Sequence, residues 1–317
     1  MDTELATMRA VRGHRRGGPE RLKYEVAPRP APAADEVLVA VRSAAITSGE
    51  LAWDATWTNS LDGTGSLRLP IVPAKEVSGQ VVEAGSAVHD LHPGDEVFGL
   101  IPFTQDGAAA EFTAVPAAVL AAKPPSLDHD GAAALALPGL TAWQGLVRHA
   151  GLTPGDTVLV HGAAGGVGSM AVQIAVALGG KVIATAAGQD AEFVRALGAE
   201  RVIDYTAQPF EDAVADVGVV FDAVGGDTQA RSWHVLRSGG TLVSIVSPPG
   251  PSPSPDTHGV FFVVEPDRAG LIALSELVES GRLTPYVDRV VPLQDTAGAY
   301  AALEREHRRG KIVLRVS

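Results

Sequence analysis

The pattern of hydrophobic and polar positions changes at about residue 128. Before that point, three short segments alternate between apolar and polar residues and are separated by glycine and proline: 36–46, 76–83 and 95–101. Alternation with a period of two places every second side chain on the same face of a strand. The first part of the chain is therefore predicted to form antiparallel or barrel-like β-structure.

Strands and helices alternate after residue 128. Six apolar segments have the composition of buried strands: 156–161, 181–185, 201–204, 217–222, 240–246 and 260–264. Helices are predicted between them, through 178, over 192–197, across 208–215 and across 227–236. Repeated units of this kind form a doubly wound α/β fold, in which helices cover a parallel sheet. An amphipathic helix over 268–280 and a strand over 311–316 complete the pattern.

This change in the hydrophobic pattern predicts two domains. Residues 1–125, completed by 267–317, are predicted to form the first domain, and residues 126–266 the second. The stretch 247–256 is rich in proline and serine, so it is predicted to be a loop.

Charge and composition narrow the function classes. The 317 residues carry a formal net charge of −12, which argues against nucleic acid or an anionic membrane as the main partner. Cysteine is absent, so disulfides, a thiolate nucleophile and a cysteine-ligated metal are excluded. No signal peptide and no apolar stretch of membrane-spanning length is recognised, and a cytoplasmic protein with a small-molecule substrate is expected.

A glycine-rich turn joins the strand that ends at His161 to a helix. Within it, Ala163-x-Gly165-x-x-Gly168 matches the dinucleotide fingerprint, with alanine at the first glycine position. Glycine permits a tight turn and lets a pyrophosphate approach the N–H groups of the helix N-terminus. A dinucleotide is therefore predicted to bind here, and a turn without a ligand is the alternative. The binding residues are predicted to be Ala164, Gly165, Gly166, Val167 and Gly168.

The residue about 20 positions beyond the glycines helps to separate NAD from NADP sites. NAD sites usually have Asp or Glu there, whereas this chain has Ala187, in the segment Thr185-Ala-Ala-Gly-Gln189. Without a carboxylate the 2′-phosphate of NADPH is not repelled, although no arginine or lysine is present to bind it. NADPH is predicted, with NADH as the alternative.

Several longer motifs make the chain similar to a known family. They are Ile71-Val-Pro-Ala-Lys-Glu-Val-Ser-Gly79, Pro93-Gly-Asp-Glu-Val-Phe-Gly99, the segment 132–143, Leu197-Gly-Ala, Val202-Ile-Asp-Tyr205, Asp222-Ala-Val-Gly-Gly226 and Arg309-Gly-Lys-Ile-Val-Leu. Over essentially its whole length, the chain resembles the zinc-independent quinone oxidoreductase branch of the medium-chain dehydrogenase/reductase superfamily.

This resemblance implies a GroES-like β-barrel domain plus a Rossmann domain, with NADPH in the cleft between them. It also implies a homodimer built through the Rossmann sheet. Ile46 and Thr141 would lie at the nicotinamide end, Tyr205 by the adenosine phosphate and Lys311 near the pyrophosphate. The other cofactor contacts are expected at Thr185, Ala187, Gln189, Val224, Ser244 and Phe262.

The resemblance also locates the positions that bind zinc in zinc-dependent relatives. They fall on Thr47, Lys75 and Leu137. These residues are not zinc ligands, so no metal is expected.

Negative charge develops on the carbonyl oxygen when a hydride reduces a quinone or an activated C=C bond, and a hydrogen-bond donor stabilises it. Lys75 is the first candidate for this donor, because burial in the cleft would lower its pKa. The alternative is a structural lysine paired with Glu76 or Glu50. Thr47 is expected either to bind substrate or to cap a turn.

Trp53 and Trp57 are spaced to share one helical face and are predicted to line the substrate pocket, with ordinary packing as the alternative. The predicted function is an NADPH-dependent oxidoreductase that reduces a quinone or an activated C=C bond. The alternative is a non-redox cyclase or isomerase, or a nucleotide-binding protein, on the same scaffold.

Overall fold

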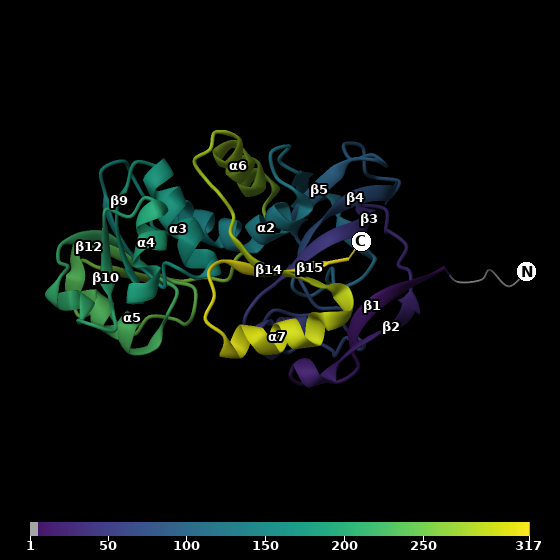
Figure 1. Cartoon of the computed structure of the whole chain (residues 1–317), viewed down its shortest axis with the longest axis horizontal. Coiled ribbons are helices and arrows are strands. Elements are labelled where there is room, and N and C mark those ends of the chain that lie inside the picture. The colour runs from purple at the N-terminus through teal and green to yellow at the C-terminus, as the bar shows by residue number, and fades with distance from the viewer. Residues whose placement is uncertain (1–5, 317) are drawn as a thin grey trace, which may run out of the picture. The chain divides into compact units, whose positions relative to one another are not determined.

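The computed structural model describes residues 6–316 and divides into two units (Figure 1). The first unit comprises the described residues up to Leu137, Glu265–Ser275 and the residues from Val287 onward. The second comprises Pro138–Val264 and Glu276–Tyr286. The predicted break after residue 125 precedes α2 (His129–Trp143), whereas the chain changes units within this helix. Among the described residues, no helix is long and apolar enough to cross a membrane.

The first unit is built on a seven-stranded sheet. Its order is β14-β15-β3-β4-β5-β7, and β6 pairs with β3. The strands are β3 (Glu36–Ile46), β4 (Glu76–Ala84), β5 (Glu96–Leu100), β6 (Phe112–Pro116), β7 (Leu120–Ala122), β14 (Val287–Pro292) and β15 (Lys311–Arg315). Segments 36–46, 76–83 and 95–101 were predicted as strands and form β3, β4 and β5. Their alternating apolar side chains fill the core of the unit.

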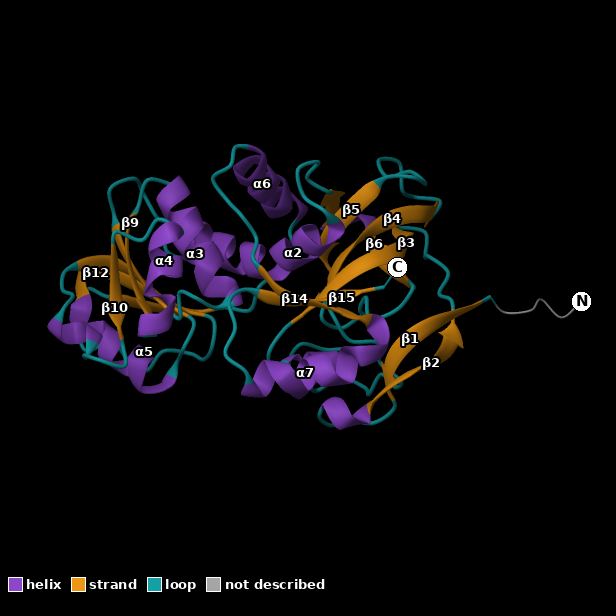
Figure 2. Ribbon diagram, in the orientation of Figure 1, coloured by secondary structure: helices purple, strands orange, loops and turns teal. Residues whose placement is uncertain are grey.

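A two-stranded ribbon, β1 (Thr7–Gly13) and β2 (Leu22–Pro28), belongs to the same unit and was not predicted. Figure 2 shows this ribbon and α7 (Thr296–Arg305). The strand β15 pairs with β3, so the C-terminal segment rejoins the first unit as expected.

The second unit contains a parallel six-stranded sheet in the order β10-β9-β8-β11-β12-β13. The strands are β8 (Thr157–His161), β9 (Lys181–Ala186), β10 (Arg201–Asp204), β11 (Val217–Asp222), β12 (Leu236–Ser244) and β13 (His258–Phe261). The helices α3 (Gly166–Ala177), α4 (Ala191–Ala196) and α5 (Gly226–Ser232) connect strands (Figure 1). The predicted α/β fold is confirmed: the first unit is built on a mostly antiparallel sheet and the second on a Rossmann-like parallel sheet.

Two segments differ from their predictions. The helix predicted across 208–215 is only a 3₁₀ turn, Phe210–Asp212, which begins after Pro209, and the backbone has no regular structure over 214–216 before β11 begins. The stretch 276–286 joins the second unit rather than the first. Gln173 in α3 holds it through two hydrogen bonds to the backbone of Thr284, at 3.1 and 2.9 Å. The helix α6 (Arg268–Glu279) matches its predicted range.

Candidate active site

Most of the predicted cofactor residues lie along one edge of the parallel sheet. Parallel strands all end at the same edge, so the loops that follow them come together there. The segments after β8, β9, β10, β11 and β13 therefore share this edge. They carry Ala164, Gly165, Gly166, Val167, Gly168, Ala187, Gln189, Tyr205, Val224 and Phe262.

The backbone of the glycine turn fits a bound pyrophosphate. Gly162 has a φ of 71°, a conformation that suits glycine. A Cβ atom on Gly168 would lie 2.1 Å from the Gly162 carbonyl oxygen, so this close packing of helix on strand requires glycine. The helix α3 begins at Gly166, with Gly165 as its N-cap. The first N–H groups of a helix have no acceptor within it and are available to a phosphate.

The side chains of two other predicted cofactor residues, Thr185 and Ser244, bind protein groups instead. Thr185 is 3% exposed, and its hydroxyl lies 3.0 Å from Nδ1 of His161. Ser244 is fully buried, and its hydroxyl donates to Asp222 at 2.9 Å. The hydroxyl groups of both residues are therefore engaged within the protein, and their contact with the cofactor stays a prediction. They support the strand ends that carry the binding loops.

His161 lies at the centre of a buried polar network. Besides Thr185, it contacts the hydroxyl of Ser232 through Nε2 at 3.0 Å. Burial lowers the pKa of His161 to about 4, although the nearby charge of Asp222 opposes the shift. The imidazole is therefore neutral near pH 7, which fits the buried, hydrogen-bonded role predicted for it.

Asp222 has a structural role that the sequence analysis did not identify. Its Oδ1 accepts hydrogen bonds from the N–H groups of Val224 at 3.0 Å and Gly225 at 2.9 Å. Its Oδ2 accepts from Nε2 of Gln229 at 3.1 Å. The carboxylate thus holds the turn that carries Val224. The signal was present in the motif Asp222–Gly226, because Asp before a glycine turn commonly caps the following N–H groups.

The turn expected at the adenosine end of the cofactor lies next to a carboxylate. Ala187 precedes a 3₁₀ turn, Gly188–Asp190, and a Cβ atom on Gly188 would lie 2.5 Å from Oδ2 of Asp204. Hydrogen bonds from the hydroxyl and N–H of Thr206 lower the pKa of Asp204, so this carboxyl group is ionised near pH 7. This arrangement opposes strong selectivity for the 2′-phosphate of NADPH.

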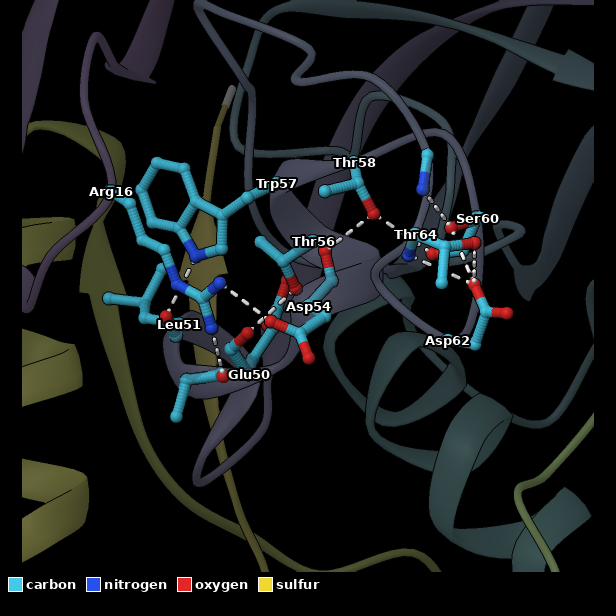
Figure 3. Close-up of polar contacts among 12 residues, drawn as sticks. Arg16, Glu50, Leu51, Asp54, Thr56, Trp57, Thr58, Ser60, Asp62 and Thr64 are labelled. Atoms are coloured by element: carbon cyan, nitrogen blue, oxygen red, sulfur yellow. Dashed lines mark hydrogen bonds and ion pairs between the residues drawn. The ribbon is translucent and has the colours of Figure 1, made fainter.

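In the first unit, polar contacts within segment 50–64 brace the loop after β3 (Figure 3). The hydroxyl of Thr56 donates to the carbonyl oxygen of Glu50 at 2.6 Å. Arg16 forms an ion pair with Asp54 at 2.6 Å. Further along, the hydroxyl of Thr58 donates to the carbonyl oxygen of Asp54 at 3.0 Å. The segment is therefore a defined structure rather than an open loop.

The two tryptophans of this segment do not share a helical face, contrary to the prediction. The helix α1 spans only Asp54–Trp57, and Trp53 precedes it in an extended conformation. Trp57 is fully buried in the core, and its indole N–H donates to the carbonyl oxygen of Leu51 at 2.8 Å. Trp53 is partly exposed and packs edge-on against Phe103, with ring centroids 5.4 Å apart. Trp57 is therefore a core residue, and only Trp53 stays a candidate for the pocket.

Lys75 is almost completely buried in the first unit, at 1% exposure. Its ammonium donates to the carbonyl oxygen of Gln105. Burial lowers the pKa of Lys75 to about 8, and the negative charge of Glu50 opposes this shift. Glu50 is also buried and accepts hydrogen bonds from the N–H of Ala74 at 2.8 Å and the hydroxyl of Tyr300 at 2.7 Å. These contacts favour the structural alternative for Lys75 over direct donation to a substrate.

Thr47 lies between two charged side chains. Its hydroxyl accepts a hydrogen bond from Nζ of Lys311 at 2.7 Å and donates to Oε2 of Glu76 at 3.0 Å. Lys311 and Glu76 also form an ion pair, with Nζ 2.8 Å from Oε1. Thr47 is partly exposed, whereas both charged residues are buried. Thr47 is thus the most exposed residue of this cluster.

The two residues expected at the nicotinamide end lie in different units. Ile46 is the last residue of β3 and is fully buried in the first unit. Thr141 lies in α2, in the second unit, and is 4% exposed. Their proximity to a cofactor stays a prediction.

The residues at the positions that bind zinc in relatives do not fit that metal. An ammonium engaged with a carbonyl oxygen, as in Lys75, and the aliphatic side chain of Leu137 offer zinc no lone pair. The sequence lacks cysteine. Over residues 6–316, no group of three or more His, Asp or Glu side chains is arranged to hold a metal ion.

Two family models match the sequence. The alcohol dehydrogenase GroES-like domain matches residues 33–125, and a model described as zinc-binding dehydrogenase matches residues 197–314. The chloroplastic NADPH-dependent alkenal/one oxidoreductase of Arabidopsis thaliana is 40% identical over 259 residues, which is 78% of this chain and 64% of that protein. The chloroplast envelope quinone oxidoreductase homolog of the same plant is 30% identical over 327 residues, which is 94% of this chain and 95% of that protein.

Solved structures share the whole fold. The quinone oxidoreductase from Coxiella burnetii superposes with a TM-score of 0.87 at 29% identity, covering 98% of this chain and 100% of that one. The CurF ER cyclopropanase from the curacin A biosynthetic pathway superposes with a TM-score of 0.83 at 26% identity, covering 98% and 99% of the two chains.

Proposed function

Because this chain belongs to the medium-chain dehydrogenase/reductase superfamily of oxidoreductases, in its quinone oxidoreductase-like branch, we propose that it is an NADPH-dependent reductase of quinones or activated C=C bonds. The observation that carries the proposal is the glycine turn between β8 and α3, whose backbone fits a dinucleotide. The relative named as an NADPH-dependent alkenal/one oxidoreductase supports both the cofactor and the class of substrate.

The chain's own residues bind the cofactor and stabilise charge. When bound, the reduced nicotinamide supplies the hydride. Gly165–Gly168 and the first turn of α3 would hold the pyrophosphate. Thr47 would donate a hydrogen bond to the substrate oxygen on which negative charge develops. The proton that completes the reduction would come from solvent.

Lys75 is the second candidate for the donor in this proposal. Its ammonium is directed to the carbonyl oxygen of Gln105, so direct donation requires the ammonium to leave this oxygen. Lys75→Met separates the two roles, because a direct donor is needed for turnover, whereas a buried structural lysine chiefly affects stability. The predicted metal-free cleft between the two domains also belongs to the proposal. A chelator is expected to leave the rate unchanged.

The first experiment is a fluorescence titration of the purified protein with NADPH and NADH in parallel. The oxidation of bound NADPH is then followed with an α,β-unsaturated ketone and with a benzoquinone. The proposal expects saturable NADPH binding and oxidation that depends on one of these acceptors. As a matched pair, Gly166→Trp should abolish binding by filling the turn, and Gly250→Ala, at a loop position with open space, should not. Failure of the unsubstituted protein to bind either cofactor would overturn the redox proposal.

A second candidate function is a non-redox reaction on the same scaffold. The solved cyclopropanase, which shares the fold over nearly the whole chain, favours keeping this candidate. It predicts tight NADPH binding without oxidation by any quinone or enone. NADPH binding without oxidation by any of the acceptors would therefore favour the non-redox function over the reductase function.

A further inference from the structure

Three neighbouring strands of the first unit bring Lys311, Thr47 and Glu76 to one end of the sheet. β15 and β4 both run antiparallel to β3 on its two sides. Thr47 directly follows the carboxyl end of β3, while Lys311 and Glu76 begin β15 and β4. The register pairs Ile312 with Ile46 on one side and Glu76 with Ala45 on the other. Three residues far apart in sequence thus meet on rigid elements, which favours precise positioning.

Each of the three side chains has a distinct role in the hydrogen bonding of this cluster. Nζ of Lys311 donates to the Thr47 oxygen at 2.7 Å, so the Thr47 hydroxyl keeps its own hydrogen for donation. That hydrogen is currently directed to Oε2 of Glu76, at 3.0 Å. Oε1 of Glu76 lies 2.8 Å from Nζ but accepts no well-aligned hydrogen bond. Donation to a substrate oxygen requires the Thr47 hydroxyl to turn away from Oε2, and the nearby ammonium then compensates the charge of Glu76.

The three side chains differ in how deeply they are buried. Glu76 has a fully buried side chain and that of Lys311 is 8% exposed, so their charges compensate each other away from water. Thr47 is the partly exposed member of the three. A hydroxyl polarised by a neighbouring ammonium, at low local dielectric, is a stronger donor to a developing oxyanion than one in water.

We propose that Lys311 is a positioning residue that, together with Glu76, holds the Thr47 hydroxyl as the hydrogen-bond donor to the carbonyl oxygen of an α,β-unsaturated ketone. This inference rests on the proposed reductase function. It requires no covalent step by the protein: the hydroxyl donates a hydrogen bond while charge develops on the oxygen. The resemblance to the family implied a different role for Lys311, near the pyrophosphate. The test below distinguishes that role from the one proposed here.

The test compares kcat on the ketone with the NADPH dissociation constant. Thr47→Val keeps the size of the side chain and removes the donor, and Thr47→Ser restores it. Lys311→Met combined with Glu76→Gln removes both buried charges together, so no unpaired charge is left inside. Lys311→Arg keeps the cation but changes its reach.

Thr47→Val is expected to lower kcat about 100-fold, as the loss of one oxyanion donor does elsewhere, and Thr47→Ser should recover most of it. The charge-removed pair should lower kcat about tenfold and leave NADPH affinity within about threefold. In the Thr47→Val background the charge-removed pair should have no further effect on kcat, because Lys311 acts through Thr47.

Three results would overturn the inference. One is a loss of NADPH affinity in the charge-removed pair that exceeds its loss of kcat, since Lys311 would then hold the cofactor. Another is additive loss of kcat from the two sets of substitutions. The third is an unchanged kcat in Thr47→Val, which would leave the reductase function standing. If thermal unfolding shows that the charge-removed pair is not folded, Lys311→Arg is measured instead: its few-fold effect on kcat must vanish in the Thr47→Val background.

A protein that binds NADPH but reduces neither ketone nor quinone fails the proposed function before any variant is made. A protein that reduces the quinone and not the ketone keeps its reductase function and contradicts this inference alone.

Discussion

Lys75 illustrates how burial changes the chemistry of a single residue. A lysine in contact with water carries its charge up to about pH 10, but removal from water disfavours the ammonium. At 1% exposure, burial lowers the pKa of Lys75 to about 8. Glu50 and Asp106 oppose the shift through their negative charge, whereas Arg68 adds to it. Lys75 is thus a buried cation whose charge costs stability near neutral pH.

The sign of this effect gives a prediction for Lys75→Met. The folded pKa of about 8 lies below the unfolded value of 10.5, so the unfolded state binds more protons between these two pH values. The free energy of unfolding of the wild-type protein should therefore rise relative to Lys75→Met, by about 2 kcal/mol between about pH 8 and pH 10. Urea denaturation at several pH values measures it.

The exposed Lys181 offers the matched control for that measurement. Lys181→Met removes an exposed lysine in the same way and is measured over the same pH range for comparison. A difference between wild type and Lys75→Met that stays constant over the same range would show that Lys75 keeps its ordinary pKa.

At the scale of the element, the turn from β8 into α3 depends on glycine for steric reasons. The helix can begin this close to the strand only because Gly168 has no side chain facing the Gly162 carbonyl. The turn from β9 into α4 has the opposite character, since it carries Ala187 beside the carboxylate of Asp204 rather than a cation. Under the proposed reductase function, the first turn governs whether a dinucleotide binds and the second governs which one.

Gly168→Ala tests the first turn. Its Cβ would lie 2.1 Å from the carbonyl oxygen of Gly162. Neither the strand nor the helix can move easily to relieve this clash, so the free energy of unfolding should fall by about 1–3 kcal/mol. NADPH binding should weaken at least tenfold as the helix moves away. Gly298→Ala in α7, where a Cβ meets nothing within 4 Å, should leave binding unchanged and slightly raise stability. Equal NADPH affinity in Gly168→Ala and wild type would contradict the placement of the pyrophosphate.

Ala187→Arg tests the second turn. A guanidinium at this position would give a 2′-phosphate the charged partner that the turn lacks, and such a hydrogen bond contributes about 1.5–3 kcal/mol. The ratio of NADPH to NADH affinity should therefore rise about tenfold or more in fluorescence titrations. Ala187→Gln, similar in length but uncharged, should leave the ratio near that of the wild type. No change in the arginine variant would place the adenosine elsewhere.

At the scale of the whole molecule, the parallel sheet of the second unit ends in an exposed edge. β13 pairs with β12 on one side. Phe261 in this strand is 38% exposed, and Val263 just beyond it is 54% exposed. Unpaired strand edges with apolar side chains tend to pair with another chain. This geometry supports the homodimer implied by the family resemblance, which stays a proposal.

Light scattering coupled to size-exclusion chromatography measures the molar mass and so distinguishes a dimer from a monomer. The wild-type protein should have twice the chain mass of 32.7 kDa. Phe261→Asp should shift it to the monomer, because a buried unpaired carboxylate opposes association at that edge. Ile272→Asp, at an apolar residue of α6 that is 49% exposed, is the control and should leave the mass unchanged. A dimeric Phe261→Asp variant would exclude this edge as the interface.

Local patterns in the sequence were enough to predict the type and order of most elements. Strands 36–46, 201–204 and 217–222 were predicted with the boundaries that the structure shows, because alternation and apolar runs are local signals. The glycine turn was predicted for a similar reason, because the steric freedom of Gly162, Gly165 and Gly168 follows directly from the residue type. The family resemblance then supplied the domain types and the class of reaction.

Which side chains meet depends on the three-dimensional packing of the chain. The sequence spaced Trp53 and Trp57 as a helical pair, but the chain bends between them and buries Trp57. It also offered no signal that Lys311, 264 residues after Thr47, donates to that hydroxyl. Periodicity acts over a few residues, whereas burial and side-chain partners arise when distant strands pair. The sequence therefore determined the elements, and the pairing of β15 and β4 with β3 decided the chemistry around Thr47.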